Sequence, residues 1–346
     1  MTRLVFVTQQ VDPAHPALAA TVAKVAALAA RVDEVVVLAD GVAPGAVPAN
    51  ARVHRFAAPT RLGRGLRFGT ALVRELRRGR RSTAVVAHMC PIYAVLAAPA
   101  ARPLGVPVLL WFTHWRASGL LRVAERLSTR VVSVDERSFP LPSRKVVATG
   151  HGIDLDEFPC AEPRRGEGLR LLALGRYSQA KGHETVVRAV HAAAARGLDV
   201  RLRVHGPTLT GAEEAHRARL EALVRELDAP VELGGPVERA RVPALLAESD
   251  ALVNNMRAGA PDKVVYEACA SCVPALASNP VFDALLPEEL RFDRDDPGSL
   301  VARLEALAAR APEERAALGR ELRARVAAGH SVDSWADAIV RAAGLA

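Results

Sequence analysis

The chain has 346 residues, of which half are hydrophobic and 24% are charged, and its formal net charge is +8. This length exceeds what one hydrophobic core usually serves, so we expect two domains, and the composition excludes a disordered chain. No stretch reaches the roughly 20 uninterrupted apolar residues of a membrane span, and the N-terminal residues run directly into a strand-like apolar segment without the pattern of a signal peptide. We therefore expect a cytoplasmic protein.

Short apolar runs alternate with amphipathic helical patterns through the first half of the chain. Strands are predicted at 4–7, 34–38, 53–56, 84–87, 108–112, 131–134 and 145–148, with helices such as 17–30 and 66–78 between them. This alternation is typical of strand–helix–strand units on a parallel sheet. The strands are apolar almost throughout, which fits a sheet covered on both faces.

Residues 154–168 contain prolines, glycines and charges without periodicity, and this composition predicts a linker. The alternation then restarts, with strands predicted at 169–174, 200–205, 231–233, 251–254 and 274–277, and helices at 181–196, 212–227, 241–248, 263–271, 299–309, 312–328 and 333–343. The pattern predicts two doubly wound α/β domains, 1–154 and 155–331, with the C-terminal segment 332–346 packing back on the first. Ligands of such sheets bind at the carboxyl ends of strands, so we expect the site in the cleft between the domains.

The segment Gly175–Gly182 follows a predicted strand and opens a predicted helix. A glycine at the strand end permits close approach of a ligand, and the start of a helix offers free N–H groups. Arg176 and Lys181 add two cations to the same turn, which suits a diphosphate. The alternative is a solvated turn with incidental basic residues.

A second segment, Asp262–Ala268, again lies between a strand and a helix. Glu267 follows Lys263 by one helical turn and lies on the same face, and a carboxylate at such a position can accept both ribose hydroxyls. The alternative is a surface pair of lysine and glutamate. The chain has only four lysines, and two of them, Lys181 and Lys263, fall in these two segments.

Together with their surroundings, these segments resemble the retaining GT-B glycosyltransferases of glycosyltransferase family 4. The landmarks, in chain order, are His151–Asp154 for N-G-V-D, Gly175–Gly182 for G-R-x-x-x-x-K-G, Val204–Pro207 for V-G-x-G-P, Val231–Gly235 for V-x-F-L-G, Ala247–Ala251 for the A-D-V element and Glu267–Pro274 for E-A-M-A-x-G-x-P. The resemblance implies a GT-B architecture, two Rossmann-like domains facing a central cleft. It also implies that Arg176 and Lys181 hold the donor diphosphate and that Glu267 holds the ribose.

The sequence departs from the family pattern at several positions. Gly259 stands where the family commonly has a first glutamate, and Cys272 replaces a usual glycine. We expect main-chain amides of the loop between Ala258 and Asp262 to face the sugar or phosphate. The predicted donor-binding residues are Gly175, Arg176, Lys181, Gly259, Ala260, Asp262, Lys263, Val264 and Glu267.

The first half matches the family less closely. The segment Gln9–Pro13 replaces the family's Gly-Gly loop, and we expect Gln9, Gln10 and Asp12 to contact donor or acceptor. His114 follows an apolar strand, and similar histidines in the family contact the donor sugar and the acceptor. We therefore place His114 with Arg176 and Lys181 as catalytic residues, with a structural histidine as the alternative. His88 is a weaker candidate of the same kind.

Two further patterns leave alternatives open. The four cysteines are too few and too scattered for a disulfide framework, and Cys269 and Cys272, which lack further zinc ligands nearby, are expected to be small buried residues on a helix. A basic stretch could lie on an anionic membrane or form a solvated helix face, and it contains Arg61, Arg64, Arg67, Arg74, Arg77, Arg78, Arg80 and Arg81. No motif supports nucleic-acid binding.

We predict a glycosyltransferase that moves a hexose-type sugar from a UDP- or GDP-sugar to a hydroxyl of a glycan, lipid-linked or small-molecule acceptor. The resemblance implies retention of configuration. No metal and no cofactor beyond the nucleotide-sugar co-substrate are expected, since the two cations and the helix start can stabilise the leaving diphosphate. The alternatives are a catalytically silent nucleotide-sugar or membrane-binding relative, and a GT-B nucleotide-sugar epimerase or hydrolase, for which no acid–base pair is evident.

Overall fold

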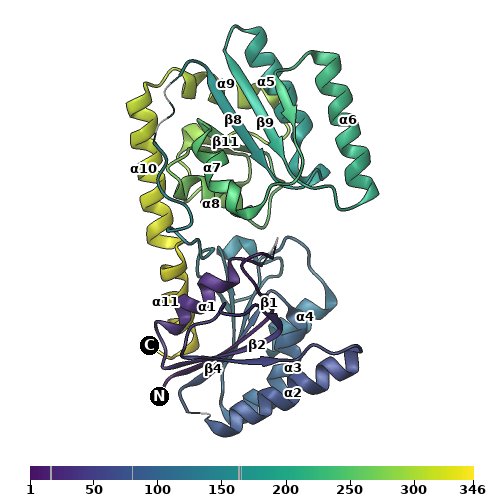
Figure 1. Ribbon diagram of the computed structural model, residues 1–346, viewed down its shortest axis with the longest axis vertical. Coiled ribbons are helices and arrows are strands. Elements are labelled where there is room, and N and C mark those ends of the chain that lie inside the picture. The colour runs from purple at the N-terminus through teal and green to yellow at the C-terminus, as the bar shows by residue number, and fades with distance from the viewer. Residues whose placement is uncertain (16–17, 80, 163, 165) are drawn as a thin grey trace. The chain divides into compact units, whose positions relative to one another are not determined.

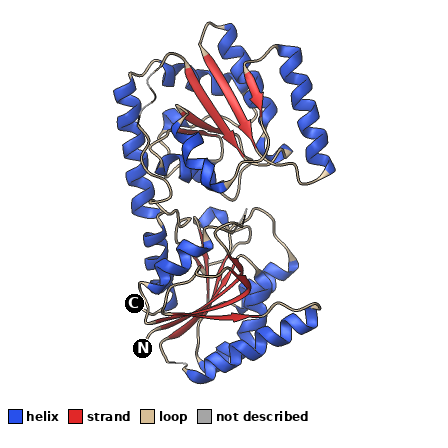
Figure 2. Cartoon of the chain, viewed as in Figure 1, coloured by secondary structure: helices blue, strands red, loops and turns tan. Residues whose placement is uncertain are grey.

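The computed structural model describes residues 1–15, 18–79, 81–162, 164 and 166–346. The chain divides into two compact units, 1–154 with 329–346, and 155–328. Each unit is an α/β structure with a parallel sheet (Figures 1 and 2). Parts of three predicted features lie outside the described residues, namely Ala17 of the predicted helix 17–30, Arg80 of the basic stretch, and positions 163 and 165 of the linker.

The first unit contains a seven-stranded sheet in the order β3-β2-β1-β4-β5-β6-β7. The strands are β1 (Arg3–Val11), β2 (Glu34–Val42), β3 (Ala51–Arg55), β4 (Thr83–His88), β5 (Val108–Trp111), β6 (Arg130–Ser133) and β7 (Val146–Ala148). The helices are α1 (Thr21–Ala29), α2 (Arg61–Arg78), α3 (Pro91–Ala101), α4 (Gly119–Leu127) and α11 (Val332–Ala343), with short 3-10 turns at Arg102–Leu104 and Glu136–Ser138.

Helices cover both faces of this sheet. Successive side chains of a strand point to opposite sides, so each strand contributes residues to both faces. Val5 and Val7 of β1 join the core that includes Phe68 of α2. Between them, Phe6 faces the other way and meets Trp335 of α11 edge-on, with ring centroids 6.5 Å apart. The near-continuous apolar strands of the sequence therefore correspond to a sheet with two dry faces.

The second unit contains a five-stranded sheet in the order β10-β9-β8-β11-β12. Its strands are β8 (Leu169–Leu174), β9 (Val200–His205), β10 (Val231–Leu233), β11 (Ala251–Asn254) and β12 (Ala275–Ala277). Its helices are α5 (His183–Ala195), α6 (Gly211–Leu227), α7 (Val242–Ala247), α8 (Lys263–Ala270), α9 (Pro297–Ala308) and α10 (Pro312–Gly329), which ends at the unit boundary, and its 3-10 turns include η3 (Gln179–Lys181) and η4 (Arg239–Arg241). The strand order reverses between β8 and β11, and such a switch point is where ligands of doubly wound sheets bind.

Two expectations about local structure in the first unit were wrong or incomplete. Gln9 and Gln10 do not lie in a loop after the first strand, since β1 continues to Val11 and pairs there with β2. Helix α3 was not predicted because its sequence, PIYAVLAAPAA, is apolar on all sides and contains Pro99, so it lacks the 3.6-residue pattern of an amphipathic helix.

The expectation for the cysteines was half right. Cys269 is buried within α8, but Cys272 lies beyond the end of that helix and forms a disulfide with Cys160. The two cysteines are 112 residues apart in sequence, so only the tertiary structure could reveal the pair.

The basic stretch forms α2, whose first turn is capped by the Thr60 side chain accepting the Gly63 amide. Phe68, Leu72 and Leu76 are buried beneath it. The N-terminal half of α2 exposes two large apolar side chains, since Leu62 is 75% exposed and Leu66 is 63% exposed. In the described ranges, no helix is long and apolar enough to cross a membrane.

Candidate functional site

The carboxyl end of β8 leads into a tight turn in which Lys181 folds back over Gly175. Gly175 has φ +134°, a conformation that side-chain-bearing residues rarely adopt. A Cβ atom at this position would lie 2.3 Å from Nζ of Lys181, and one at Gly206 would lie 1.9 Å from the Gly175 carbonyl oxygen. The turn therefore requires glycine both for its backbone and for the position of the lysine.

Lys181 joins the two segments that the sequence singled out. Its ammonium group donates to the carbonyl of Leu174 at 3.3 Å and pairs with the carboxylate of Asp262. The side-chain amide of Asn254, at the end of β11, donates to the same Asp262 oxygen at 2.7 Å. Since β8 and β11 are neighbours at the switch point, their carboxyl ends bring together a cation, a carboxylate and an amide.

Helix α8 begins at this cluster without a side-chain cap. Asp262 is its N-cap residue, but its carboxylate accepts from Lys181 and Asn254 instead of from the helix amides. The first turn of α8, at Lys263 and Val264, therefore presents backbone N–H groups and the positive end of the helix dipole, which favour an anion.

Glu267 is a buried carboxylate held by two cations. Its side chain is 4% exposed, and it pairs with Lys263 Nζ at 2.8 Å and with the guanidinium of Arg239 from η4. Burial alone would raise the pKa of Glu267, but Lys263 and Arg239 outweigh it and lower the pKa below the ordinary value. The carboxylate is thus ionised and able to accept hydrogen bonds, as a ribose contact requires.

Arg176 points to a different partner from Lys181. Its guanidinium is 55% exposed and lies 3.2 Å from the carboxylate of Glu213 on α6. Glu213 also accepts the amide of Leu209 at 2.7 Å. Both predicted phosphate-binding cations are therefore next to a carboxylate, and a bound diphosphate would compete with these contacts.

The loop between β11 and α8 is anchored at several points. The amide of Arg257 donates to the carbonyl of Ala180 at 3.0 Å. The side-chain amide of Asn279 donates to the carbonyls of Arg257 and Ala260, at 3.3 and 3.5 Å. Gly259 has φ +120°, so its backbone is one that favours glycine over the glutamate common in the resembling family.

The chain is similar to a known protein family and to several solved structures. Residues 168–311 match the family described as "Glycosyl transferases group 1", and no curated protein matches the chain. Among solved structures, a sucrose-phosphate synthase from Thermosynechococcus elongatus superposes with a TM-score of 0.72 at 18% identity, covering 99% of this chain and 98% of that one. Anabaena Alr3699/HepE in complex with UDP and glucose gives a TM-score of 0.75 at 15% identity, with 99% of both chains covered. A trehalose-6-phosphate structure from E. coli, bound with UDP-2-fluoro glucose, gives a TM-score of 0.70 at 12% identity, with 98% of both chains covered.

The chain has the GT-B fold. The TM-scores and the coverage of both chains confirm the two Rossmann-like α/β domains expected from the sequence. The family match covers all of the predicted donor-binding residues from Gly175 to Glu267.

In this GT-B chain, three residues near the Lys181–Asp262 and Lys263–Glu267 pairs were not singled out from sequence. Asn254 and Arg239 contact Asp262 and Glu267 respectively. His183, the first residue of α5, is buried, and desolvation together with Lys181 lowers its pKa to about 3, so its ring is neutral. The position of His183 directly after Lys181–Gly182 was the one sequence signal for it, whereas Asn254 and Arg239 had none.

The predicted residues of the first GT-B unit lie at the end of β1 and just beyond it. Gln9 is exposed, and the side chain of Gln10 lies over Gly41 of β2, where an added Cβ would be 2.3 Å from its Oε1. Asp12 follows the strand, and its carboxylate accepts the amide of Ala14 at 2.9 Å. Gln9 and Gln10 thus stand on the strand itself and only Asp12 follows it, whereas the sequence predicted a loop. Their contact with donor or acceptor stays a prediction.

The two histidines of this unit differ in kind. His114 is exposed, its Nδ1 accepts the amide of Arg116 at 3.0 Å, and its ring stacks on Trp115 with centroids 5.5 Å apart. His88 is buried, stacks on Trp111 and lies 3.3 Å from the Thr8 hydroxyl. Burial, with a smaller contribution from Lys24, holds the pKa of His88 well below its ordinary value. His88 therefore has a structural environment, whereas His114 is accessible to a ligand.

Proposed function

We propose that this protein is a glycosyltransferase that takes a hexose-type sugar from a UDP- or GDP-sugar and transfers it to a hydroxyl group. The main support is the contact between Lys181 and Asp262 at the switch point of the second sheet. This contact lies beside the start of α8, which has no side-chain cap. This unit matches the glycosyl transferases group 1 family, and the HepE structures of similar fold are complexes with UDP or UDP-glucose.

The proposed reaction uses these groups to stabilise the leaving nucleoside diphosphate. As the bond from the sugar to the phosphate oxygen breaks, negative charge grows on the diphosphate, and Lys181, Arg176 and the α8 amides are the groups to neutralise it. Asp262 and Glu213 hold the two cations in the unliganded protein. Main-chain amides near Gly259 and Ala260 would contact the sugar or phosphate, and Glu267 would accept the ribose hydroxyls.

Retention of configuration and independence of metal are further parts of the proposal. The acceptor hydroxyl would attack from the face that the diphosphate leaves, and the leaving phosphate would take its proton. Lys181 and Arg176 supply the positive charge that a divalent cation would otherwise supply. His114 would contact the donor sugar or the acceptor, and Gln9, Gln10 and Asp12 would line the same part of the first unit.

The test is release of nucleoside diphosphate from UDP- and GDP-hexoses, with glycan, lipid-linked and small alcohol acceptors offered in turn. We expect the wild type to release UDP or GDP and Lys181→Ala to lose at least about 100-fold of this rate, since a charge-assisted contact to the leaving group is removed. Arg196→Ala is the matched control, because Arg196 is an exposed cation at the opposite end of α5. Equal rates in the two variants would contradict the proposal.

A catalytically silent relative remains the second candidate, favoured by Gly259 in place of the family's first glutamate. It predicts that the wild type binds a nucleotide sugar without releasing nucleoside diphosphate with any acceptor. Restoring a carboxylate by Gly259→Glu is strained at φ +120°. Binding without release is therefore the outcome that would separate the two candidates.

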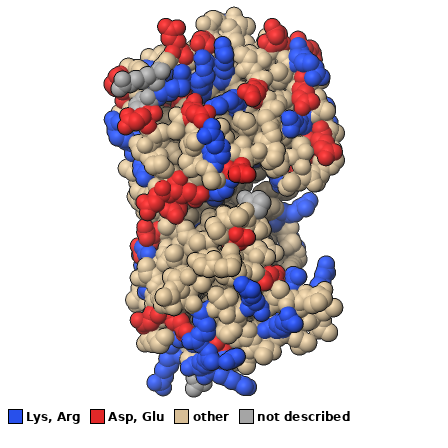
Figure 3. All heavy atoms as spheres, viewed as in Figure 1, with Lys and Arg blue, Asp and Glu red and all other residues tan. Residues whose placement is uncertain are grey.

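We also propose peripheral contact between the first unit and an anionic membrane on the cytoplasmic side. Exposed apolar residues occur on three helices of this unit that pack side by side, namely Leu62 and Leu66 on α2, Ile92 and Leu96 on α3, and Leu120 and Val123 on α4. Arginines of α2 are interleaved with them, and Figure 3 shows basic side chains gathered over the lower end of the view, where the first unit lies. Apolar side chains flanked by cations suit a surface of anionic lipid.

Vesicle flotation tests this contact. We expect binding to phosphatidylglycerol vesicles but not to phosphatidylcholine vesicles, and loss of binding when Leu62 and Leu66 are both changed to serine. Leu209→Ser is the control, because Leu209 is a leucine of the second unit with a comparable exposure of 64%. Undiminished flotation of the double variant would contradict the assignment of this surface.

A further inference from the structure

The carboxylate proposed to hold the ribose depends on a second carboxylate that touches no part of the proposed ligand site. Glu267 is held by Arg239, and Arg239 is in turn held by Glu157 through two parallel hydrogen bonds, Nε to Oε1 at 2.6 Å and Nη2 to Oε2 at 2.9 Å. The guanidinium also lies over the ring of Phe158, 4.7 Å from its centroid. The guanidinium of Arg239 therefore donates through Nε and Nη2 to Glu157 and through Nη1 to Glu267.

This arrangement fixes the orientation of Arg239. A bidentate pair with a carboxylate restricts the guanidinium plane more tightly than a single contact does. Burial would lower the pKa of Arg239, but Glu267 and Glu157 together raise it above its ordinary value. Without Glu157 the arginine would keep its charge but lose the contact that directs its free nitrogen at Glu267.

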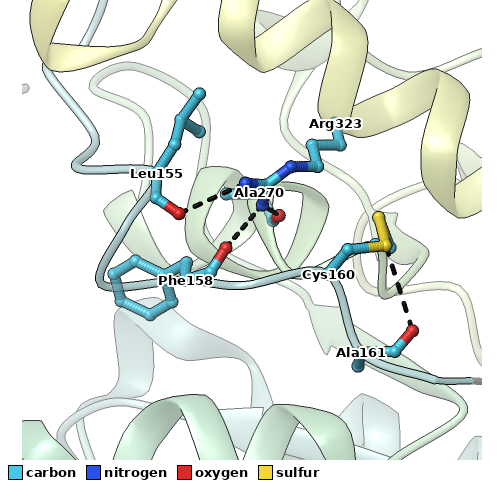
Figure 4. Close-up of a disulfide and its surroundings, with 7 residues drawn as sticks. Leu155, Phe158, Cys160, Ala161, Ala270 and Arg323 are labelled. Carbon is cyan, nitrogen blue, oxygen red and sulfur yellow. Dashed lines mark hydrogen bonds between the residues drawn. A yellow bond between two sulfur atoms is a disulfide. The ribbon is translucent and has the colours of Figure 1, made fainter.

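The segment that carries Glu157 is fastened to the far end of α8. The guanidinium of Arg323 from α10 donates to the carbonyls of Leu155, Phe158 and Ala270, as Figure 4 shows. The amide of Ala161 donates to the carbonyl of Ser271 at 2.8 Å.

A disulfide adds a covalent link at the same place. Cys160 bonds to Cys272, just beyond the last residue of α8, with the Cα atoms 4.9 Å apart. Cys272 has φ +59°, a conformation unfavourable for a residue with a side chain. Helix α8 thus carries Lys263 and Glu267 on its first turns and holds the segment 155–161 at its end.

We propose, on the basis of the nucleotide-sugar function proposed above, that Glu157 is a positioning residue for ribose recognition. It orients Arg239, which orients the Glu267 carboxylate, and the Cys160–Cys272 link keeps the segment with Glu157 against α8. The ligand group that this chain of contacts recognises is the pair of ribose hydroxyls of the donor.

The experiment compares each nucleotide with its deoxy analogue by calorimetric titration, using UDP with 2′-deoxy-UDP and GDP with 2′-deoxy-GDP. The wild type should prefer the ribonucleotide by at least about 10-fold, as expected for a hydrogen bond to a charged group. Glu157→Gln, which keeps the size of the side chain, should reduce this preference to about 3-fold or less, mostly by weakening ribonucleotide binding. The deoxynucleotide keeps its 3′-hydroxyl, so its affinity should also fall, but by a smaller factor than that of the ribonucleotide.

Two controls separate positioning from loss of structure. Glu162→Gln changes an exposed carboxylate one residue beyond the segment 155–161 and should leave the preference unchanged. Cys160→Ser should lower the preference less than Glu157→Gln does, since Arg323 and the Ala161 bond still hold the segment. A larger effect of Cys160→Ser would contradict the order of contacts proposed.

The outcomes also separate this inference from the function on which it rests. If the wild type binds neither UDP nor GDP, the proposed function itself fails. If the wild type binds one of them with a ribose preference, and Glu157→Gln leaves this preference intact, only the positioning role is overturned. The same holds if Glu157→Gln weakens the binding of the ribonucleotide and of the deoxynucleotide by the same factor. A wild type that binds without any ribose preference overturns it as well.

Discussion

The carboxyl ends of the two sheets carry different kinds of side chains, although both sheets reverse their strand order there. In the second unit the edge is charged and paired, with Lys181 on Asp262 and Lys263 on Glu267. In the first unit the corresponding strands end in the apolar Val11, which follows Gln10, and in the buried His88. Each unit thus has a switch point at which a ligand could bind. The side chains at that point, and not the fold, decide which unit is suited to the charged part of a substrate.

The largest effect should come from removing the central carboxylate of the charged edge. Glu267→Ala leaves Lys263 and Arg239 partly buried without this partner, so we expect the free energy of unfolding of the second unit to fall by about 3 kcal/mol. Urea unfolding followed by a probe in that unit measures this. A loss below about 1 kcal/mol would mean that the cations are solvated after the change and that the pairing is not structural.

Gly175→Ala should lower both stability and nucleotide affinity. The new methyl group is strained at φ +134° and meets Lys181, so we expect about 1–3 kcal/mol of destabilisation and roughly 10-fold weaker nucleotide binding. Gly197→Ala is the matched control, because Gly197 has φ +91° but nothing within 4 Å of an added Cβ. The control should lose stability without losing affinity, and equal losses of affinity would show that strain alone is responsible.

His183 should make the stability of the second unit depend on pH. Its pKa is lowered from 6.5 to about 3 in the folded state, so between these values the unfolded chain binds a proton that the folded chain does not. Stability is therefore full above about pH 6.5 and falls by up to about 1.4 kcal/mol for each pH unit below it. Unfolding free energies at pH 7.0, 6.0 and 5.0 should show a shallower slope in His183→Gln than in wild type, and parallel slopes would refute the assignment.

The smallest effect is expected in the first unit. His114→Ala should leave the Kd for UDP or GDP within about twofold, since the charged edge proposed to bind the nucleotide lies in the other unit. Turnover should nevertheless fall, because His114 is proposed to contact sugar or acceptor. Calorimetry and nucleotide release on one preparation would separate the two readouts, and a large change in Kd would break the contrast between the units.

The sequence was most informative where chemistry is concentrated in short segments. Gly175–Gly182 and Asp262–Ala268 each place charges at the start of a helix that follows a strand, so both could be identified without the structure. Alternating apolar and amphipathic runs likewise predicted both parallel sheets. Such segments can be predicted from sequence because the residues that form them are neighbours both in the chain and in space.

Contacts formed by distant segments could not be predicted. Glu157 and Arg239 are 82 residues apart, and Cys160 and Cys272 are 112 apart. The continuation of β1 through Gln9 and Gln10 depends on pairing with β2, because polar residues favour a loop when considered alone. These features are set by tertiary packing, which overrides local preference.

The most direct test of the central claim is calorimetric titration of UDP and GDP into the wild type, Lys181→Ala and Arg196→Ala. We expect wild type and Arg196→Ala to bind one of the two nucleotides with the same Kd. Lys181→Ala should bind it with a Kd at least about 10-fold higher, because one charge-assisted contact to phosphate is lost. Equal binding by all three proteins, or no binding of either nucleotide by the wild type, would contradict the claim that the paired edge of the second unit is a nucleoside diphosphate site.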